Sequence, residues 1–272
     1  MTMTTSTLPS LFVPHGAPTF ALQPGAAGAA LARQAAALPR PRAVIAVSAH
    51  WETARPTIGT ATRLETMHDF RGFPEALYSI RYPATGCPEA ARAVGRAIQA
   101  AGLQVDSDAD RGLDHGAWVP LRMMFPAADV PVVPLSLQPQ AGPAHALRVG
   151  RALAPLRRKG LLVVASGNLT HNLRDYFEAG PEHAEPPAYV RRFADWMHGQ
   201  LLAGDTAALL DYRMQAPDAR RAHPSEEHLL PLFVALGAAG EGFETLRFHT
   251  GIDDAVLATD AFAFTARGDT VH

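Results

Sequence analysis

The stretch Ala43-Val44-Ile45-Ala46-Val47-Ser48-Ala49-His50-Trp51-Glu52 decides the fold that we expect for this chain. Its first half is a short apolar run with several β-branched residues, typical of a strand buried on both faces of an α/β sheet. Its second half brings Ser48, His50 and Glu52 to the carboxyl end of that strand. Because ligands bind at this edge of open α/β sheets, the stretch predicts a buried strand with a site at its end.

Two other segments repeat this design. An apolar strand over residues 161–166 stops at small polar residues and is followed by His171. Near the amino end, a strand over residues 10–14 leads directly into His15. Three strands that each end on a histidine can converge on one point, and we expect a metal ion there.

Composition limits the classes of protein to consider. A chain of 272 residues with 47% apolar residues can bury a sizeable core, and we expect one domain over residues 1–272. A net charge of −2 gives no basic footprint for nucleic acid or an anionic membrane. The single Cys87 excludes an internal disulfide and fits a reducing compartment.

The amino-terminal residues lack the basic and apolar regions of a secretory signal, and no apolar run reaches the roughly 20 residues that span a bilayer. We therefore expect a cytoplasmic protein with no nucleic-acid or membrane partner. The chain has twelve histidines but one cysteine, so any metal site must use imidazole and carboxylate ligands.

Apolar segments and helical segments alternate along the chain, which indicates an α/β fold. Strands are expected at residues 10–14, 43–49, 57–60, 103–106, 130–137, 161–166, 244–250 and 256–266. Helices are expected at residues 26–38, 87–101, 143–157, 187–202 and 223–236, with short helical pieces at 205–211 and 217–222. Two loops, 68–78 and 112–120, are rich in Gly, Pro or aromatic residues, and the first is expected to cover the site.

Five of the histidines stand out by their context, although any one alone is more often structural. His15, His50 and His171 follow strands, His115 lies in a loop between Asp114 and Gly116, and His228 is expected on the inner face of a helix beside Glu227. A neutral imidazole binds first-row metals, and a neighbouring carboxylate fixes its tautomer. Asp114, Glu52 and Glu227 are available for that role.

The remaining histidines have simpler explanations. His68 is either an ordinary loop residue or a substrate contact, and His223 is either a helix cap or part of the chemistry. The others are expected on the surface: His145, His183, His198, His249 and His272.

Several common chemistries are excluded by missing motifs. The chain has no His-Glu-x-x-His helix and no cysteine cluster, which argues against zincins and zinc fingers. Ser166 lacks the Gly-x-Ser-x-Gly elbow of a nucleophilic serine. The usual glycine-rich phosphate loops are also missing.

A series of short runs resembles the 4,5-DOPA extradiol dioxygenase family, one of the class III extradiol ring-cleaving enzymes. The resemblance covers essentially the whole chain, in order and at natural spacing. The runs are Pro14-His15-Gly16-Ala17-Pro18, Val47-Ser48-Ala49-His50-Trp51, His68-Asp69-Phe70-x-Gly72-Phe73-Pro74, Leu77-Tyr78, Tyr82-Pro83-Ala84, Leu113-Asp114-His115-Gly116-Ala117-Trp118, Ala165-Ser166-Gly167-Asn168-x-x-His171-Asn172-Leu173 and Glu227-His228-x-x-Pro231-Leu232.

The resemblance implies an α/β sandwich with a central mixed sheet flanked by helices and a metal at the carboxyl ends of the strands. It implies that His15, His50 and His228 hold the metal, with His171 as a further ligand or as the acid/base. His115 is placed as a catalytic group that faces the substrate and oxygen. Residues expected to contact or wall the planar ring, or else simply to pack the loops, are His68, Trp51, Phe70, Phe73, Tyr78 and Trp118.

The implied reaction is cleavage of a catechol such as DOPA beside its diol, with both atoms of O₂ inserted to give a muconic semialdehyde. One departure bears on the metal: the wider class has two His and one Glu on iron, whereas the third position here is His228. One divalent ion per chain is expected, Fe(II) for activity and Zn(II) as isolated. The alternatives are a zinc-dependent hydrolase and a catalytically silent zinc-binding protein. A monomer or small homo-oligomer is expected.

Overall fold

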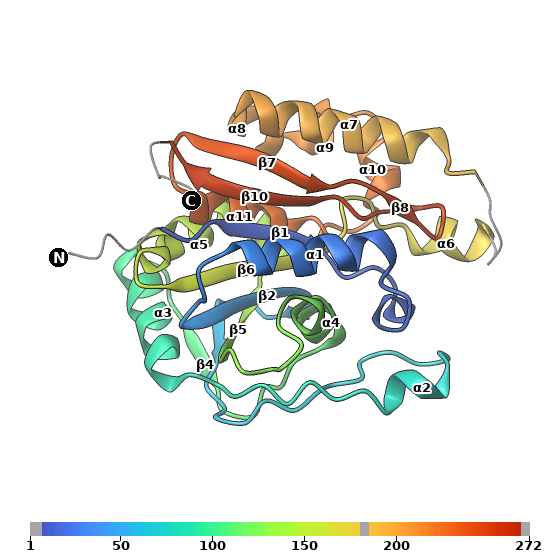
Figure 1. Cartoon of the computed structure of the whole chain (residues 1–272). Coiled ribbons are helices and arrows are strands. Elements are labelled where there is room, and N and C mark those ends of the chain that lie inside the picture. The colour runs from blue at the N-terminus through green and yellow to red at the C-terminus, as the bar shows by residue number, and fades with distance from the viewer. Residues whose placement is uncertain (1–6, 180–184, 268–272) are drawn as a thin grey trace.

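An eight-stranded mixed sheet forms the centre of the molecule, with the strand order β4-β3-β5-β2-β6-β1-β10-β7 (Figure 1). The four central strands β5, β2, β6 and β1 are parallel, whereas β3 and β10 run antiparallel to their central neighbours. The strands are β1 (Ser10–Pro14), β2 (Ala43–Glu52), β3 (Thr57–Gly59), β4 (Asp106–Asp108), β5 (Val132–Leu137), β6 (Leu161–Gly167), β7 (Phe243–His249) and β10 (Ala261–Ala266), with β8 (Ile252–Asp253) and β9 (Leu257–Ala258) in a separate pair.

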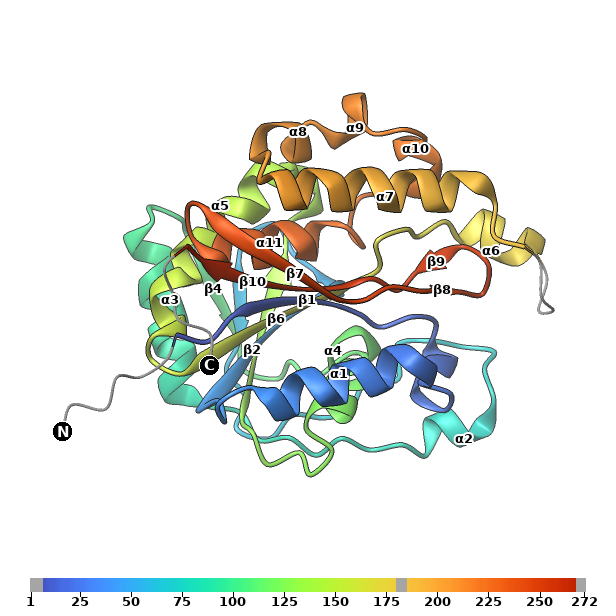
Figure 2. The ribbon, with the colours of Figure 1, turned by 45° about the horizontal axis from the view of Figure 1, so that its top comes forward.

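Helices cover both faces of the sheet, and this arrangement confirms the predicted α/β sandwich (Figure 2). One face carries α1 (Gly25–Ala37) and α4 (His115–Met124); the other carries α3 (Pro88–Ala100), α5 (Gly142–Arg157), α7 (Ala188–Ala203) and α11 (Leu230–Ala239). The shorter helices are α2 (Glu75–Tyr78), α6 (Leu173–Ala179), α8 (Thr206–Leu210), α9 (Tyr212–Gln215) and α10 (Ala219–Ala222), with 3-10 turns at Pro18–Ala21 and Pro139–Ala141.

The predicted central strand is buried on both faces. Ile45 and Val47 pack in the core beneath α5 and α11, whereas Val44 and Ala46 pack in the core beneath α1 and α4. Side chains alternate along a strand, so each face receives every second residue. His50 lies on the same side of β2 as Val44 and Ala46, and its ring reaches the face of the sheet that α4 covers.

The expected loop over residues 112–120 is wrong in its second half, where α4 begins at His115. Asp114 caps this helix: its side chain accepts a hydrogen bond from the amide of Ala117 at 3.1 Å. The sequence predicts a loop at Gly116, whereas this residue lies in the first helical turn, which packs closely against Ser48 and His50.

Helix α11 also differs from the prediction. It runs through Gly237 to Ala239 instead of ending before the glycine. A Cβ at position 237 would lie 2.1 Å from the carbonyl oxygen of Leu147, so this glycine permits close contact with α5. Because α11 begins only at Leu230, His228 lies in the turn before the helix and not on its inner face.

Two strand predictions need smaller corrections. The edge strand expected at 103–106 is β4, a few residues later at Asp106–Asp108. The strand expected at 256–266 is divided into β9 and β10, because β9 turns away to pair with β8.

The structure, a computed structural model, describes residues 7–179 and 185–267. Within these ranges no helix is long and apolar enough to cross a bilayer. His183 and His272 lie outside the described residues, and the single domain over 1–272 stays a prediction.

Candidate metal centre

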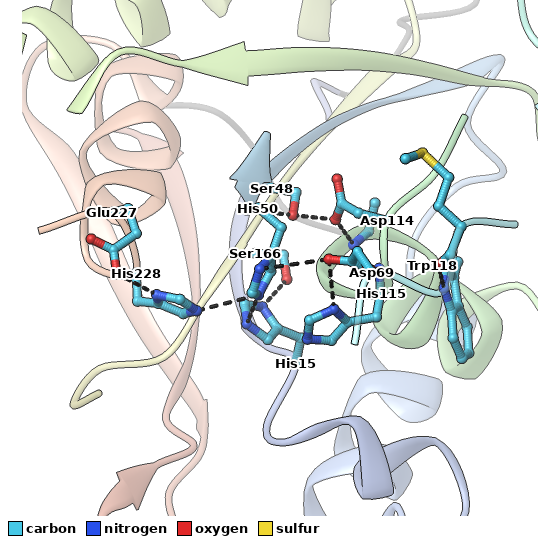
Figure 3. Close-up of polar contacts among 12 residues, drawn as sticks. His15, Ser48, His50, Asp69, Asp114, His115, Trp118, Ser166, Glu227 and His228 are labelled. Carbon is cyan, nitrogen blue, oxygen red and sulfur yellow. Dashed lines mark hydrogen bonds and ion pairs between the residues drawn. The ribbon is translucent and has the colours of Figure 1, made fainter. Parts of the chain in front are cut away.

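Three imidazole rings meet at the carboxyl edge of the parallel strands (Figure 3). Nε2 of His50 lies 3.2 Å from Nε2 of His15 and 3.3 Å from Nε2 of His228. His15 follows β1, His50 lies near the end of β2, and His228 comes from the turn before α11. Nitrogen ligands at about 2.0–2.1 Å from one metal ion are separated by roughly 2.9–3.4 Å, so these spacings fit a shared divalent ion.

The partners on the far side of two rings hold them in place. Glu227 accepts a hydrogen bond from Nδ1 of His228 at 3.0 Å, and Ser166 lies 2.9 Å from Nδ1 of His15. A carboxylate is only an acceptor, so the His228 proton is on Nδ1 and the Nε2 lone pair faces the other rings. This is the outer support that metal-binding histidines usually have.

Burial keeps the three rings neutral. It lowers the pKa of His15 and His228 well below the usual value of 6.5, and neighbouring histidines lower it further. Burial also lowers the pKa of His50 to about 3, although Asp69 and Glu227 act in the opposite direction. A neutral imidazole is the form that binds a metal, so the environment favours binding at neutral pH.

His115 lies beside this group at the amino end of α4. Its ring centroid is 4.1 Å from that of His50 and 5.5 Å from that of His15. Asp69 contacts His115 through both carboxylate oxygens. Oδ1 accepts a hydrogen bond from the backbone amide of His115 at 2.8 Å, and Oδ2 lies 3.0 Å from Nδ1 of its ring (Figure 3). Burial by itself would raise the pKa of Asp69. The interactions of its carboxylate with His115 and His50 have the larger combined effect and lower this pKa to about 2.

His171 lies on the opposite side, stacked on His228 with 3.4 Å between ring centroids and 6° between planes. Burial lowers its pKa to about 4, against the opposing effect of Glu227. One ring nitrogen each of His171 and His228 and a carboxylate oxygen of Glu227 lie within 4.8 Å of one another. His171 therefore lies within reach of the three histidines His15, His50 and His228. Its side chain makes no hydrogen bond to any residue in the ranges 7–179 and 185–267.

A network of polar side chains, formed by Ser48, Arg111 and Asp114, lies next to His50 and His115. Asp114 accepts a hydrogen bond from Ser48 and forms an ion pair with Arg111. The Arg111 guanidinium carbon in turn lies 4.8 Å from the Trp51 ring centroid. Gly116 is required here: a Cβ at this position would lie 2.4 Å from Ser48 Oγ.

The histidines line the floor of a cavity of about 300 Å³. Its walls are mostly apolar and come from the segment after β1, the loop over residues 68–78, and α6. The lining residues are His15, Gly16, Ala17, Pro18, His50, Phe70, Arg71, Phe73, His115, His171, Leu173, Tyr176, Phe177, Glu227, His228 and Leu257. The cavity thus brings together the five predicted histidines with Phe70 and Phe73.

Four of the residues expected to contact or wall the ring lie outside this lining. Trp118 is fully buried, and its Nε1 donates to the carbonyl of Met67 at 2.9 Å. His68 faces the carbonyl of Ile80 at 3.2 Å, and Trp51 lies beneath Arg111. These side chains pack within the surrounding loops, which is the alternative that the sequence left open for them. Tyr78 packs against Phe70 and also lies behind the lining.

Comparison with known proteins agrees with this geometry. A family model described as the catalytic LigB subunit of aromatic ring-opening dioxygenase matches residues 10–254. This chain belongs to that family. The 4,5-DOPA dioxygenase extradiol of Beta vulgaris is 36% identical over 267 residues, which cover 94% of this chain and 96% of the relative. The Escherichia coli (strain K12) protein of the same name is 36% identical over 241 residues, 87% of each chain.

A solved structure has the same fold. The crystal structure of an uncharacterized Escherichia coli K12 protein matches with a TM-score of 0.76 and 29% identity, covering 94% of this chain and 99% of that one. The chain is therefore an extradiol dioxygenase, an oxidoreductase that acts on a small molecule and O₂.

Sequence reasoning assigned no role to two residues that hold the rings of this dioxygenase. Asp69 contacts the ring of His115, and Ser166 contacts the ring of His15. The sequence suggested Ser166 only as a possible nucleophile. Asp69 directly follows His68 in one of the quoted runs, and that was the available signal. Of the carboxylates expected beside the histidines, Glu227 contacts His228, Asp114 contacts Ser48 instead, and Glu52 is exposed.

Proposed function

We propose that this dioxygenase cleaves a catechol such as DOPA beside its diol, using one divalent metal ion held by His15, His50 and His228. The observation that carries the proposal is the convergence of three Nε2 atoms, 3.2 and 3.3 Å apart, on the floor of the cavity. Both atoms of O₂ enter the product, a muconic semialdehyde, so the reaction needs no external reductant.

The donor set fits Fe(II) and Zn(II) alike. Three neutral imidazoles add no negative charge, and a site of this type binds Zn(II) more tightly than Fe(II). When bound, Fe(II) supplies the one-electron chemistry that lets a catechol react with O₂, whereas Zn(II) has no accessible redox change. We therefore assign activity to the iron form and expect zinc in protein isolated in air.

His115 is proposed as the base that accepts a catechol proton. The Asp69 carboxylate, with its pKa of about 2, accepts from Nδ1 and holds the proton there. Nε2 of His115 is therefore unprotonated, and the ring lines the cavity where the substrate would bind. An imidazole held in this tautomer presents a free Nε2 lone pair that can accept a proton from the substrate.

His171 is proposed as the second proton carrier. It lines the same cavity from the other side, stacked on His228, and its lowered pKa keeps it neutral in the resting protein. The apolar walls, among them Phe70, Phe73 and Leu257, exclude water around a planar ring.

A direct test combines metal analysis with turnover. His50→Ala protein should lose bound metal and all cleavage, because it lacks the ligand that is central to the three nitrogen atoms. Cleavage is followed by the yellow semialdehyde, and labelled O₂ should place both of its atoms in the product. Full metal retention by His50→Ala would contradict the site, and failure of the iron-loaded wild type on every catechol tried would contradict the reaction.

A further inference from the structure

Arg71 is a cation at the wall of the cavity with no partner in the described protein. Its side chain is exposed and lines the cavity together with His50 and His115. Within residues 7–179 and 185–267, the structure gives its guanidinium no hydrogen bond or ion pair. The carboxylate that shares the cavity wall, Glu227, is already bound by His228 and by Ser225.

The backbone that carries Arg71 is anchored on both sides. Asp69 is held by His115, and the Phe70 ring lies 5.6 Å from both the Phe73 and the His115 ring centroids. Two residues of extended chain span at most about 7 Å, so Arg71 cannot lie far from Asp69 and the cluster. Its backbone position is therefore restricted by its neighbours, whereas its guanidinium has no partner among the residues that the structure describes.

The surroundings determine what this charge would bind. The cavity that Arg71 lines is walled mostly by apolar side chains, among them Phe73, Leu173 and Phe177. A guanidinium pairs with a carboxylate through two parallel hydrogen bonds, and apolar surroundings strengthen that pairing relative to open water. The diol end of a catechol would face the histidines, so the group that reaches Arg71 is the substituent on the other side of the ring.

We propose that Arg71 binds an anionic substituent of the substrate, so that this enzyme prefers catechols that carry a carboxylate on a short side chain. The inference rests on the proposed function and adds to it the group that selects the substrate. Arg71 takes no part in the proton transfers, so its loss should weaken binding and raise KM far more than it lowers kcat.

The test uses two catechols that differ only in charge: 3-(3,4-dihydroxyphenyl)propionate and its carboxamide. Binding to the zinc-loaded protein is measured by calorimetry, and cleavage by the iron-loaded protein is measured by steady-state kinetics. Wild type should bind the acid at least about tenfold more tightly than the carboxamide, the scale of one charged hydrogen bond. Arg71→Gln should remove that preference, Arg71→Lys should restore part of it, and the surface variant Arg92→Gln should behave as wild type.

The outcomes separate the two proposals. Equal binding of the acid and carboxamide by wild type, or a preference that survives in Arg71→Gln, would overturn the role of Arg71. Cleavage of the carboxamide would in that case still support the proposed reaction. If the acid binds with an Arg71-dependent preference but neither compound is cleaved, the recognition site stands and the reaction is wrong. Binding of neither compound would overturn both.

Discussion

Asp69 controls which nitrogen of His115 carries a proton. Its two oxygens are both used, one by the His115 amide and the other by Nδ1 of the ring. In Asp69→Asn the backbone N–H of His115 still needs an acceptor, and the asparagine side chain has only one oxygen to offer. The NH₂ group of the asparagine would therefore face Nδ1 of the His115 ring. The ring would then have to place its proton on Nε2 and could no longer accept one from the substrate.

We therefore expect Asp69→Asn to keep its metal and to lose roughly 10²–10⁴ in kcat, the usual contribution of a positioned acid or base. His115→Ala should show a similar loss, and the double variant should be no worse than either single variant, because the pair acts as a unit. Asp110→Asn, at an exposed position in a nearby loop, is the control. Unchanged turnover in Asp69→Asn would reduce this contact to a structural one.

At the scale of elements, the site depends on how closely the first turn of α4 approaches the end of β2. A Cβ on Gly116 would lie 2.8 Å from Cδ2 of the His50 ring as well as against Ser48. Gly116→Ala should therefore displace His50, weaken metal binding and lower the free energy of unfolding by about 1–3 kcal/mol, typical of overpacking.

Gly199→Ala is a matched control for that substitution. Gly199 lies inside α7, and a Cβ there would meet no atom within 4 Å. Its replacement should raise stability by up to about 1 kcal/mol through helix propensity and leave metal binding unchanged. Metal titration and urea unfolding of both variants provide the comparison. Wild-type metal affinity in Gly116→Ala would show that the close contact does not position His50.

The sequence predicted the strands of the sheet better than the elements around them. The apolar run of β2 admits little else than a buried strand, and its alternation is visible in the residues themselves. The sequence placed Gly116 and Gly237 outside helices, because local sequence rules treat glycine as a residue that ends or interrupts a helix. In the fold each lies inside a helix, where another element comes too close for a side chain.

The same distinction applies to the site. Histidines at strand ends could be predicted to converge, because parallel strands meet at one edge. The partners Asp69 and Ser166 could not be assigned, since they come from a loop and from a neighbouring strand whose register is not encoded locally. Trp51 and Trp118 adjoin site residues in sequence but point elsewhere, and adjacency alone does not predict where a side chain points.

At the scale of the whole molecule, the buried neutral histidines make the metal-free protein sensitive to acid. Burial lowers the pKa of His223 from 6.5 to about 3, and its ring nitrogen Nε2 faces the Leu169 carbonyl at 2.9 Å. The unfolded state binds the proton first, so this stability is fully present above pH 6.5 and is lost as the pH falls toward 3.

Each such group should steepen the pH dependence of the free energy of unfolding by up to about 1.4 kcal/mol per pH unit below pH 6.5. His223→Gln, which keeps an N–H donor and does not titrate, should remove one such contribution. Urea unfolding of both metal-free proteins from pH 7 downward measures the two slopes. Equal slopes would mean that His223 is not protonated on unfolding in this range.

The central claim, metal-dependent catechol cleavage at the three-histidine site, is tested most directly by exchanging the metal in one protein preparation. Protein stripped of metal is loaded anaerobically with either Fe(II) or Zn(II), mixed with a catechol and exposed to air. We predict that the iron form produces the yellow semialdehyde, whereas the zinc form binds the catechol and leaves it intact. Cleavage by rigorously iron-free zinc protein at the rate of the iron form would contradict this account. Inactivity of both forms on catechols, with hydrolysis of esters or amides by the zinc form, would favour a hydrolase instead.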